Sequence, residues 1–282
     1  MFSRLVASLT LIALVFSAGC GSHQQAGTLT VPRKEKLTIG GTGANIPLLG
    51  KLADVYMEKH KDVAIEIPAS LDTEDTIRNT LEGNLDIGLD SLPINKTQGE
   101  AGLQQTLYAK TIVVFAVNPS TPISGLSSQQ VRGIFSGRIT NWSSVGGPDR
   151  KIVVLIGERG QATRVVVDKY IKGFSNLGIP PEAVILKNFL AMNEGITSIR
   201  DSIGWTDMGA IKADDQKIKP LSLDGRLPTV ENYQNGKYPL IKNLYLLTKG
   251  EPQGAAKEFV DFALGWEGKK VILDNGYLVA DK

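Results

Sequence analysis

The segment IFSGRITNWSSVGGPDRKIVVLIGERGQATR, residues 134–164, is the most informative part of the sequence. Its apolar run from Ile152 to Ile156 is bounded by turn residues and predicts a short buried strand. The composition after Thr163 predicts a helix, so that Thr163 and Arg164 lie at the helix start, where unpaired N–H groups and the helix dipole favour negative charge. The segment therefore fits a loop that binds an anion. It also fits a plain connection in which Arg164 forms a surface ion pair.

The first twenty residues predict export. Arg4 precedes an apolar run from Leu5 to Phe16, which small residues and Cys20, the only cysteine, follow. The run is too short to span a bilayer comfortably and ends as a cleaved signal does. We expect a signal peptide at residues 1–19, a lipid on Cys20 and a polar tether at residues 20–36, which would anchor an exported protein in the periplasm or at the cell surface. A plain secretory signal with an incidental cysteine is the alternative.

Charge and composition argue against several function classes. Lys and Arg total 31 against 29 Asp and Glu, so bulk charge gives no reason to expect nucleic acid as a partner. The two histidines are His23 in the tether and His60 at a lysine-rich helix end, which argues against Ser-His, Cys-His and His-rich zinc sites. We therefore expect no catalytic residue, no metal and no cofactor. A phosphoesterase that uses Glu158, Arg159 and Asp90 is the enzymatic alternative.

Strand and helix patterns alternate along the chain, which predicts an α/β protein with a parallel sheet. The length suits two lobes better than one sheet. Ligands of α/β proteins bind at the carboxyl ends of strands, so the loops with Thr42, Asp90 and Gln161 are expected to converge on one cleft. The expected elements are strands at Leu37–Ile39, Val63–Ile67, Leu85–Gly88, Ile112–Val117, Ile152–Ile156, Ile203–Trp205 and Leu244–Leu247, and helices at Pro47–His60, Asp72–Glu82, Ser127–Phe135, after Thr163, and at Met192–Arg200, Ala255–Leu264 and Glu267–Asp274.

Six segments together indicate a family. They are Asp86–Ile94, Ile123–Ser127, Ile134–Trp142 with Gly146 and Gly147 (the pattern "IFsGkitnW…vGG"), Ile203–Trp205, Tyr238–Gly250 ("yPl.rpLY..tkg") and Gly276–Val279. In these segments, and over nearly all of residues 37–278, the chain resembles the phosphate-binding family of periplasmic solute-binding proteins that serve ABC transporters.

The resemblance implies a two-lobed α/β periplasmic-binding-protein fold (type II) that closes on one small ligand. Lobe 1 would comprise residues 37–110 and 222–282, and lobe 2 residues 111–221. Two hinge crossings are expected, one near Leu107 to Val113 and one after Trp205.

The resemblance also assigns ligand contacts to three loops, with departures from the family pattern. In the second loop, Asp90 would accept a proton from monoprotonated phosphate. In the third loop, the family's arginine and serine positions are Gly157 and Gln161, so Arg159 or Arg164 would have to compensate. The expected ligand residues are Thr42, Gly43, Ala44, Asn45, Asp90, Ser91, Gln161, Ala162, Thr163 and Arg164.

The function implied by the resemblance is that of an exported solute-binding lipoprotein of an ABC importer. It would bind phosphate or a related small oxyanion between its lobes as a monomer, and would present the closed form to a membrane permease. The changed ligand loops leave sulfate-like anions, oxometallates and small carboxylates open as ligands. They also leave open an extracellular anion-sensing or interaction protein that has kept the fold and lost transport.

Overall fold

The computed structural model describes residues 34–213 and 217–280. The predicted signal peptide at residues 1–19, Cys20 and most of the predicted tether lie outside the described residues. Within the described ranges, no helix is both long enough and apolar enough to cross a membrane.

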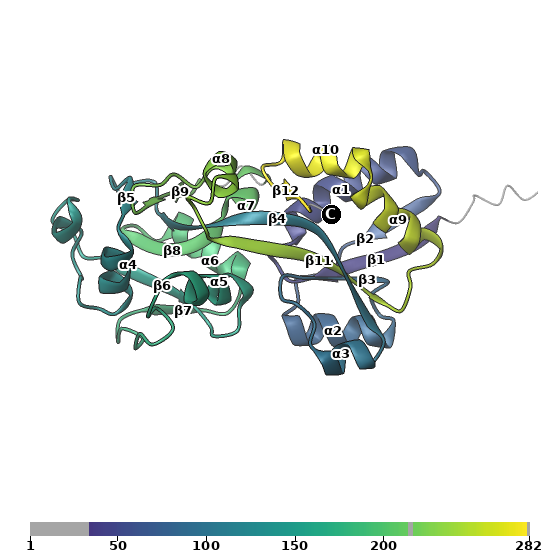
Figure 1. Ribbon diagram of the computed structural model, residues 1–282, viewed down its shortest axis with the longest axis horizontal. Coiled ribbons are helices and arrows are strands. Elements are labelled where there is room, and N and C mark those ends of the chain that lie inside the picture. The colour runs from purple at the N-terminus through teal and green to yellow at the C-terminus, as the bar shows by residue number, and fades with distance from the viewer. Residues whose placement is uncertain (1–33, 214–216, 281–282) are drawn as a thin grey trace, which may run out of the picture. The chain divides into compact units, whose positions relative to one another are not determined.

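The chain forms alternating strands and helices (Figure 1). The strands of the described residues are β1 (Glu35–Gly41), β2 (Val63–Glu66), β3 (Ile87–Asp90), β4 (Leu103–Val117), β5 (Gly125–Leu126), β6 (Val153–Gly157), β7 (Val184–Leu186), β8 (Ser202–Asp207), β9 (Lys219–Pro220), β10 (Ser222–Leu223), β11 (Ile241–Lys249) and β12 (Leu278–Val279). The helices are α1 (Ile46–Lys59), α2 (Thr73–Glu82), α3 (Lys96–Glu100), α4 (Ser128–Phe135), α5 (Ala162–Tyr170), α6 (Phe189–Ser198), α7 (Met208–Ala213), α8 (Val230–Gln234), α9 (Gly254–Leu264) and α10 (Trp266–Asp274), with a 3-10 turn at Trp142–Val145.

Local signals in the sequence explain where several of the predicted helices begin and end. The Asp72 side chain accepts a hydrogen bond from the Asp75 amide and so caps α2, and Gly83 ends that helix with a φ of 78°. Ser127 and Gln130 form a capping box at the start of α4. These contacts satisfy end groups that a helix cannot pair internally, which is why the predicted boundaries of α2 and α4 agree closely with the structure.

The strands form a mixed sheet in the order β2-β1-β3-β11-β4-β8-β6-β7. β1 pairs in parallel with β2 and β3, and β6 pairs in parallel with β7 and β8. In the middle, β11 is antiparallel to β3 and β4, and β4 is antiparallel to β8. The prediction of a parallel sheet is therefore right for its two ends and wrong for its centre, because two long strands run in opposite directions between two cores.

Figure 1 shows β4 and β11 side by side along this central part of the fold. Tyr108 and Ala109 of β4 pack in one hydrophobic cluster, and the same strand enters the other cluster from Ile112 onward. β11 likewise runs from Ile241, which packs against the second cluster, to Leu244 in the first. Each long strand therefore contributes side chains to both cores.

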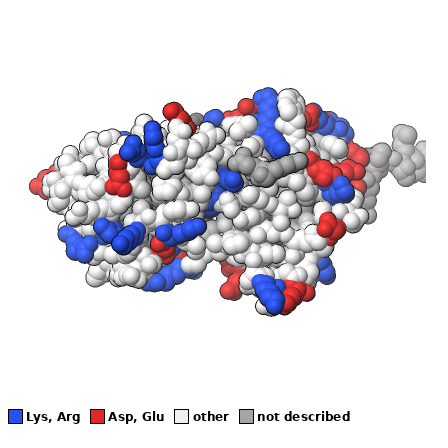
Figure 2. All heavy atoms as spheres, viewed as in Figure 1, with Lys and Arg blue, Asp and Glu red and all other residues white. Residues whose placement is uncertain are grey.

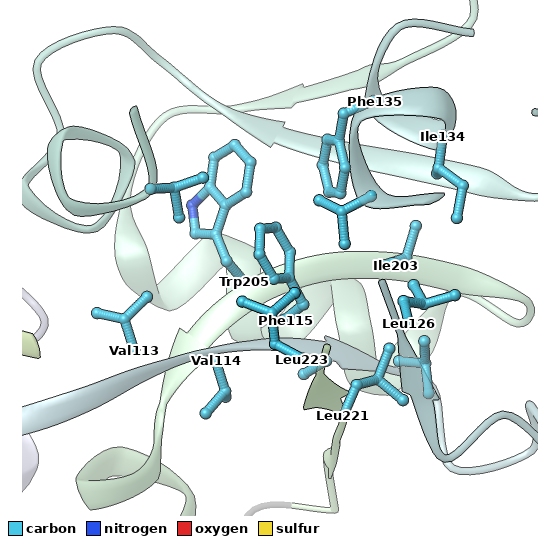
Figure 3. Packing of buried hydrophobic residues seen from close by; sticks show 14 of the residues in the cluster. Val113, Val114, Phe115, Leu126, Ile134, Phe135, Ile203, Trp205, Leu221 and Leu223 are labelled. Atoms are coloured by element: carbon cyan, nitrogen blue, oxygen red, sulfur yellow. The ribbon is translucent and has the colours of Figure 1, made fainter. Parts of the chain in front are cut away.

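The larger hydrophobic cluster is built around aromatic rings. Phe135 stacks on Trp205 with 5.4 Å between ring centroids, and Phe115 and Phe174 lie 5.6 and 5.3 Å from Phe135. Figure 3 shows Phe115, Phe135 and Trp205 converging in this cluster. The segment of residues 134–164 thus contributes the Phe135 ring to the centre of this core.

The smaller cluster packs α1 against the C-terminal helices. Tyr56 of α1 makes edge contacts with Phe259 and Phe262 of α9, with 5.3 Å between centroids in both pairs. The division into residues 37–110 with 222–282 and residues 111–221 stays a prediction. Leu223, Tyr238 and Leu240, which that division assigns to lobe 1, pack in the larger cluster with Trp205.

Truncation of Phe135 tests the importance of the aromatic cluster. We expect Phe135→Ala to lower the free energy of unfolding by about 3 to 5 kcal/mol, because it removes a ring that touches three others and leaves a cavity. Trp266→Ala is the matched aromatic control, since Trp266 is 76% exposed and its loss is expected to change the value by no more than about 0.5 kcal/mol. Urea titration measures both values, and equal effects of the two substitutions would contradict the assignment.

Candidate functional site

A cavity of about 420 Å³ lies where the three predicted loops meet. It is lined by residues 42–44 after β1, 90–92 at the end of β3 and 158–163 after β6, together with residues 71–74 and 187–189. The loops after β1, β3 and β6 all follow carboxyl ends of strands, where α/β proteins gather ligand groups. The structure therefore brings Thr42, Asp90 and Gln161 to one cavity, as the sequence predicted. Whether they bind a ligand stays a prediction.

In the first loop, Thr42, Gly43 and Ala44 line the cavity, and Asn45 is buried behind them. Asn45 Nδ2 donates to Thr42 Oγ1 at 2.9 Å and to Ser91 Oγ at 3.1 Å, while Asn45 Oδ1 accepts from the Tyr108 hydroxyl. Both hydroxyl oxygens accept from the amide, so the protons of Thr42 and Ser91 remain available to another acceptor. Asn45 thus orients two cavity-lining hydroxyls.

In the second loop, Asp90 lines the cavity with 2% of its surface exposed. Its Oδ1 accepts from Thr73 Oγ1 at 3.0 Å and from the Ser91 amide at 2.8 Å. Burial away from water raises the pKa of the Asp90 carboxyl, and these hydrogen bonds offset only part of that shift. Because burial destabilises the ionised carboxylate, a partner that donates a hydrogen bond to Asp90 would offset part of this destabilisation.

In the third loop, Gln161 is the N-cap residue of α5, but its side chain makes no capping hydrogen bond. Its amide nitrogen donates to the carbonyl oxygens of Leu186 and Lys187, at 3.1 and 2.7 Å. The first-turn N–H groups at Ala162 and Thr163 therefore lie at the cavity without a side-chain cap, beside the positive end of the helix dipole. Gln161 positions the loop through two backbone carbonyls.

In the same loop, the Gln161 side chain lies against Gly157. A Cβ atom on Gly157 would lie 2.4 Å from Gln161 Oε1 and 3.3 Å from Trp205 Cζ2. A larger residue at position 157 would require the Gln161 side chain to move. Gly157 and Gln161, which stand where the resembled family has arginine and serine, are thus in contact with each other.

Arg164 does not line the cavity. Its Nε donates to Asp168 Oδ1 at 3.0 Å, and its guanidinium lies 5.4 Å from the centroid of Phe174 and 5.6 Å from that of Trp205. Arg164 therefore forms an ion pair, as the alternative interpretation of this segment expected, but its side chain is buried in the aromatic cluster and not on the surface. Arg159 is exposed at the cavity edge.

The charged side chains around the cavity include more acids than bases. Asp72, Glu74, Asp90 and Glu158 line it together with the bases Arg159 and Lys187. An anion in this cavity would therefore depend on N–H and hydroxyl donors more than on a field of basic residues. On the face shown in Figure 2, basic and acidic side chains occur on both halves, in keeping with the balanced composition.

Phe189, Lys242 and Asp207 are among the residues next to the cavity that the sequence did not single out. Phe189 lines it at the start of α6, while Lys242 and Asp207 form a buried ion pair 2.8 Å long behind Thr163. Lys242 lies in the already recognised segment Tyr238–Gly250, as a charged residue in an apolar strand. That mismatch was the available signal, because a lysine is almost never buried without a partner.

Comparison with known proteins places the chain in a family. Residues 24–267 match the model of a family described as the PBP superfamily domain. The phosphate-binding protein PstS of Bacillus subtilis is 28% identical over 98% of this chain and 94% of its own length. PstS of Borreliella burgdorferi is 23% identical over 86% of this chain and 89% of its own length.

Solved structures show the same fold. A phosphate ABC transporter substrate-binding protein with bound phosphate, from Clostridium perfringens, superposes with a TM-score of 0.77 at 23% identity, covering 88% of this chain and 100% of that one. The effector-binding domain of a BenM variant gives a TM-score of 0.54 at 13% identity, covering 88% of this chain and 100% of that one. The phosphate-binding relatives are binding proteins and not enzymes, as the sequence predicted.

The family match spans most of the chain, and the fold matches solved binding proteins over nearly all of the described residues. The chain is similar to phosphate-binding proteins and has the two-lobed α/β fold that the sequence predicted. It therefore belongs to the family described as the PBP superfamily domain.

Proposed function

We propose that the protein binds phosphate, or a closely related small oxyanion, in the cavity between the loops after β1, β3 and β6. The observation that carries this proposal is the start of α5, whose N–H groups lack a side-chain cap and lie at a cavity together with the hydroxyls of Thr42, Ser91 and Thr163. A tetrahedral oxyanion needs nearly every oxygen satisfied once it is buried. Helix N–H groups and hydroxyls supply such donors without a net charge.

Asp90 supports phosphate over anions that carry no proton. A buried carboxylate repels a fully deprotonated oxyanion but accepts a hydrogen bond from a monoprotonated phosphate. Burial raises the pKa of this carboxyl because the ionised form loses hydration, and a hydrogen bond from a phosphate hydroxyl would replace part of that hydration. The proposed donors to the ligand are Thr42, Ser91, Thr163 and the backbone of Gly43, Ala44, Gln161 and Ala162, and Asn45 serves as an internal brace. The Arg164 side chain is not included, since it does not line the cavity.

The proposed role is that of the solute-binding component of an ABC importer. The support is the similarity to phosphate-binding proteins over nearly the whole chain, and the description of two solved relatives as a phosphate ABC transporter substrate-binding protein and an ABC-type phosphate transport receptor. Closure of the two lobes on the anion would present a surface to a membrane permease. Export by residues 1–19, a lipid on Cys20 and a monomeric state belong to the same proposal.

Titration calorimetry with phosphate and sulfate tests the ligand. We expect the mature chain to bind phosphate at least about tenfold more tightly than sulfate at neutral pH. Sulfate has no hydroxyl to donate to Asp90, so that a sulfate oxygen and a carboxylate oxygen, both acceptors, would face each other. Asp90→Asn should weaken phosphate binding and reduce this preference. Equal constants for the two anions, or no binding of either, would overturn the phosphate proposal.

Asp90 also gives a pH-dependent prediction for the ligand-free protein. Burial raises its folded pKa, so its protonated form contributes stability at low pH that is lost as the pH rises through that pKa. Asp90→Asn cannot ionise and should therefore be more stable than wild type at neutral pH, with a smaller difference below about pH 4. Urea titrations at both pH values measure this, with the exposed Asp54→Asn of α1 as control. A lower stability of Asp90→Asn at neutral pH would contradict it.

Replacement of Cys20 tests the anchor. In a host that processes lipoproteins, we expect the wild-type protein in the membrane fraction and Cys20→Ala in the soluble fraction, because the thiol is the proposed site of lipid attachment. Fractionation followed by immunoblotting makes the measurement. An unchanged distribution would favour the plain secretory signal.

A further inference from the structure

Lys242, at the start of β11, is buried to 1% exposure directly behind the cavity wall. Its Nζ lies 2.8 Å from Asp207 Oδ2, 3.1 Å from Thr163 Oγ1 and 4.6 Å from the centroid of the Phe189 ring. Thr163 and Phe189 line the cavity, whereas Lys242 and Asp207 do not. The cation is therefore separated from the cavity by side chains that it contacts directly.

We propose that Lys242 is the positioning cation of the anion site and acts through the hydroxyl of Thr163. The inference rests on the proposed function of the cavity. An ammonium group only donates, so Thr163 Oγ1 accepts from Lys242 and its own proton is left for another acceptor. Thr163 is the second residue of α5, at the cavity, so the acceptor is a ligand oxygen. Donation from a charged group strengthens the hydroxyl as a donor in turn.

Asp207 holds the ammonium in this place. Its Oδ2 accepts from Lys242, and its Oδ1 accepts from the Ala210 amide at 2.8 Å, so both carboxylate oxygens have partners. The pair carries no net charge, which keeps the buried position tolerable. Its positive member is the one in contact with the cavity wall. Asp207 and Lys242 therefore place a dipole with its positive end toward Thr163.

The other basic residues near the cavity do not supply a buried positive charge at its wall, whereas Lys242 does. Position 157, where the resembled family has arginine, is glycine, and the Gln161 side chain lies against it. Arg164 is paired with Asp168 inside the aromatic cluster. Arg159 and Lys187 are exposed at the cavity edge, where water screens their charge. Among the described residues, Lys242 is the buried cation that contacts a hydroxyl of the cavity wall.

A set of variants tests the inference by calorimetry with inorganic phosphate. The exposed ion pair of α9, neutralised by Lys257→Met with Asp261→Asn, is the matched control and should leave the dissociation constant within about threefold of wild type. The neutral pair Lys242→Met with Asp207→Asn should raise it roughly 10- to 100-fold, as expected for loss of a charge-assisted donor. Thr163→Val should raise it by a similar factor. Adding Thr163→Val to the neutral pair should raise the dissociation constant by less than about a further threefold, because Lys242 and Thr163 act on the ligand through the same hydrogen bond.

The outcomes separate this inference from the function on which it rests. If wild type binds neither phosphate nor sulfate, the proposed function fails and the inference fails with it. If wild type binds phosphate and the neutral pair binds it equally well, only the inference fails. A purely structural ion pair would lower the unfolding midpoint of the neutral pair without raising its dissociation constant, which also contradicts the inference.

Folding of each variant is checked by its unfolding midpoint. Should the neutral pair not fold, the wild-type protein labelled with ¹⁵N-lysine decides. The Lys242 ammonium resonance, assigned by its loss in Lys242→Arg, should shift when phosphate is added. A resonance that stays in place at saturating phosphate overturns the inference.

Discussion

Burial of polar groups at the carboxyl ends of β1, β3 and β6 is the constraint on which the site depends. A hydroxyl or carboxyl group removed from water must find a partner, and here the partners lie behind the cavity wall. The Asn45 amide donates to Thr42 and Ser91, and the Lys242 ammonium donates to Thr163. In each contact the hydroxyl oxygen is the acceptor, so its proton is left over. The same arrangement that satisfies the buried oxygens therefore creates a set of donors toward the cavity.

The two long antiparallel strands make this arrangement possible. β4 and β11 contribute side chains to both hydrophobic clusters, and Lys242 lies where β11 begins. Asp207 ends β8, which pairs with β4 through Val113. The buried ion pair therefore connects the strands that pass between the cores to the helix start that borders the cavity. A change at this pair would be felt by the ligand loop as well as by the central strands.

The fold alone does not decide the ligand, since the effector-binding domain of a BenM variant has the same fold at 13% identity. The choice of ligand depends on the loops after β1, β3 and β6 that line the cavity. Where the resembled family has arginine this chain has glycine, with the Gln161 side chain lying against it, and the cavity lining contains more acids than bases. A small oxyanion that carries a proton fits neutral donors together with a buried acid. This combination makes phosphate the ligand that we propose.

Most of the elements, the two-lobed fold class and the three loops at the cavity could be predicted from the sequence. Periodicity and capping residues such as Asp72 and Ser127 act locally, and six ordered segments are specific enough to indicate a family. The burial of Arg164 away from the cavity, the bracing role of Asn45 and the meeting of Lys242 and Asp207 behind Thr163 became visible in the folded chain. Lys242 and Thr163 are 79 residues apart in the chain. Such contacts depend on how strands cross and which way side chains point, and no local pattern carries that information.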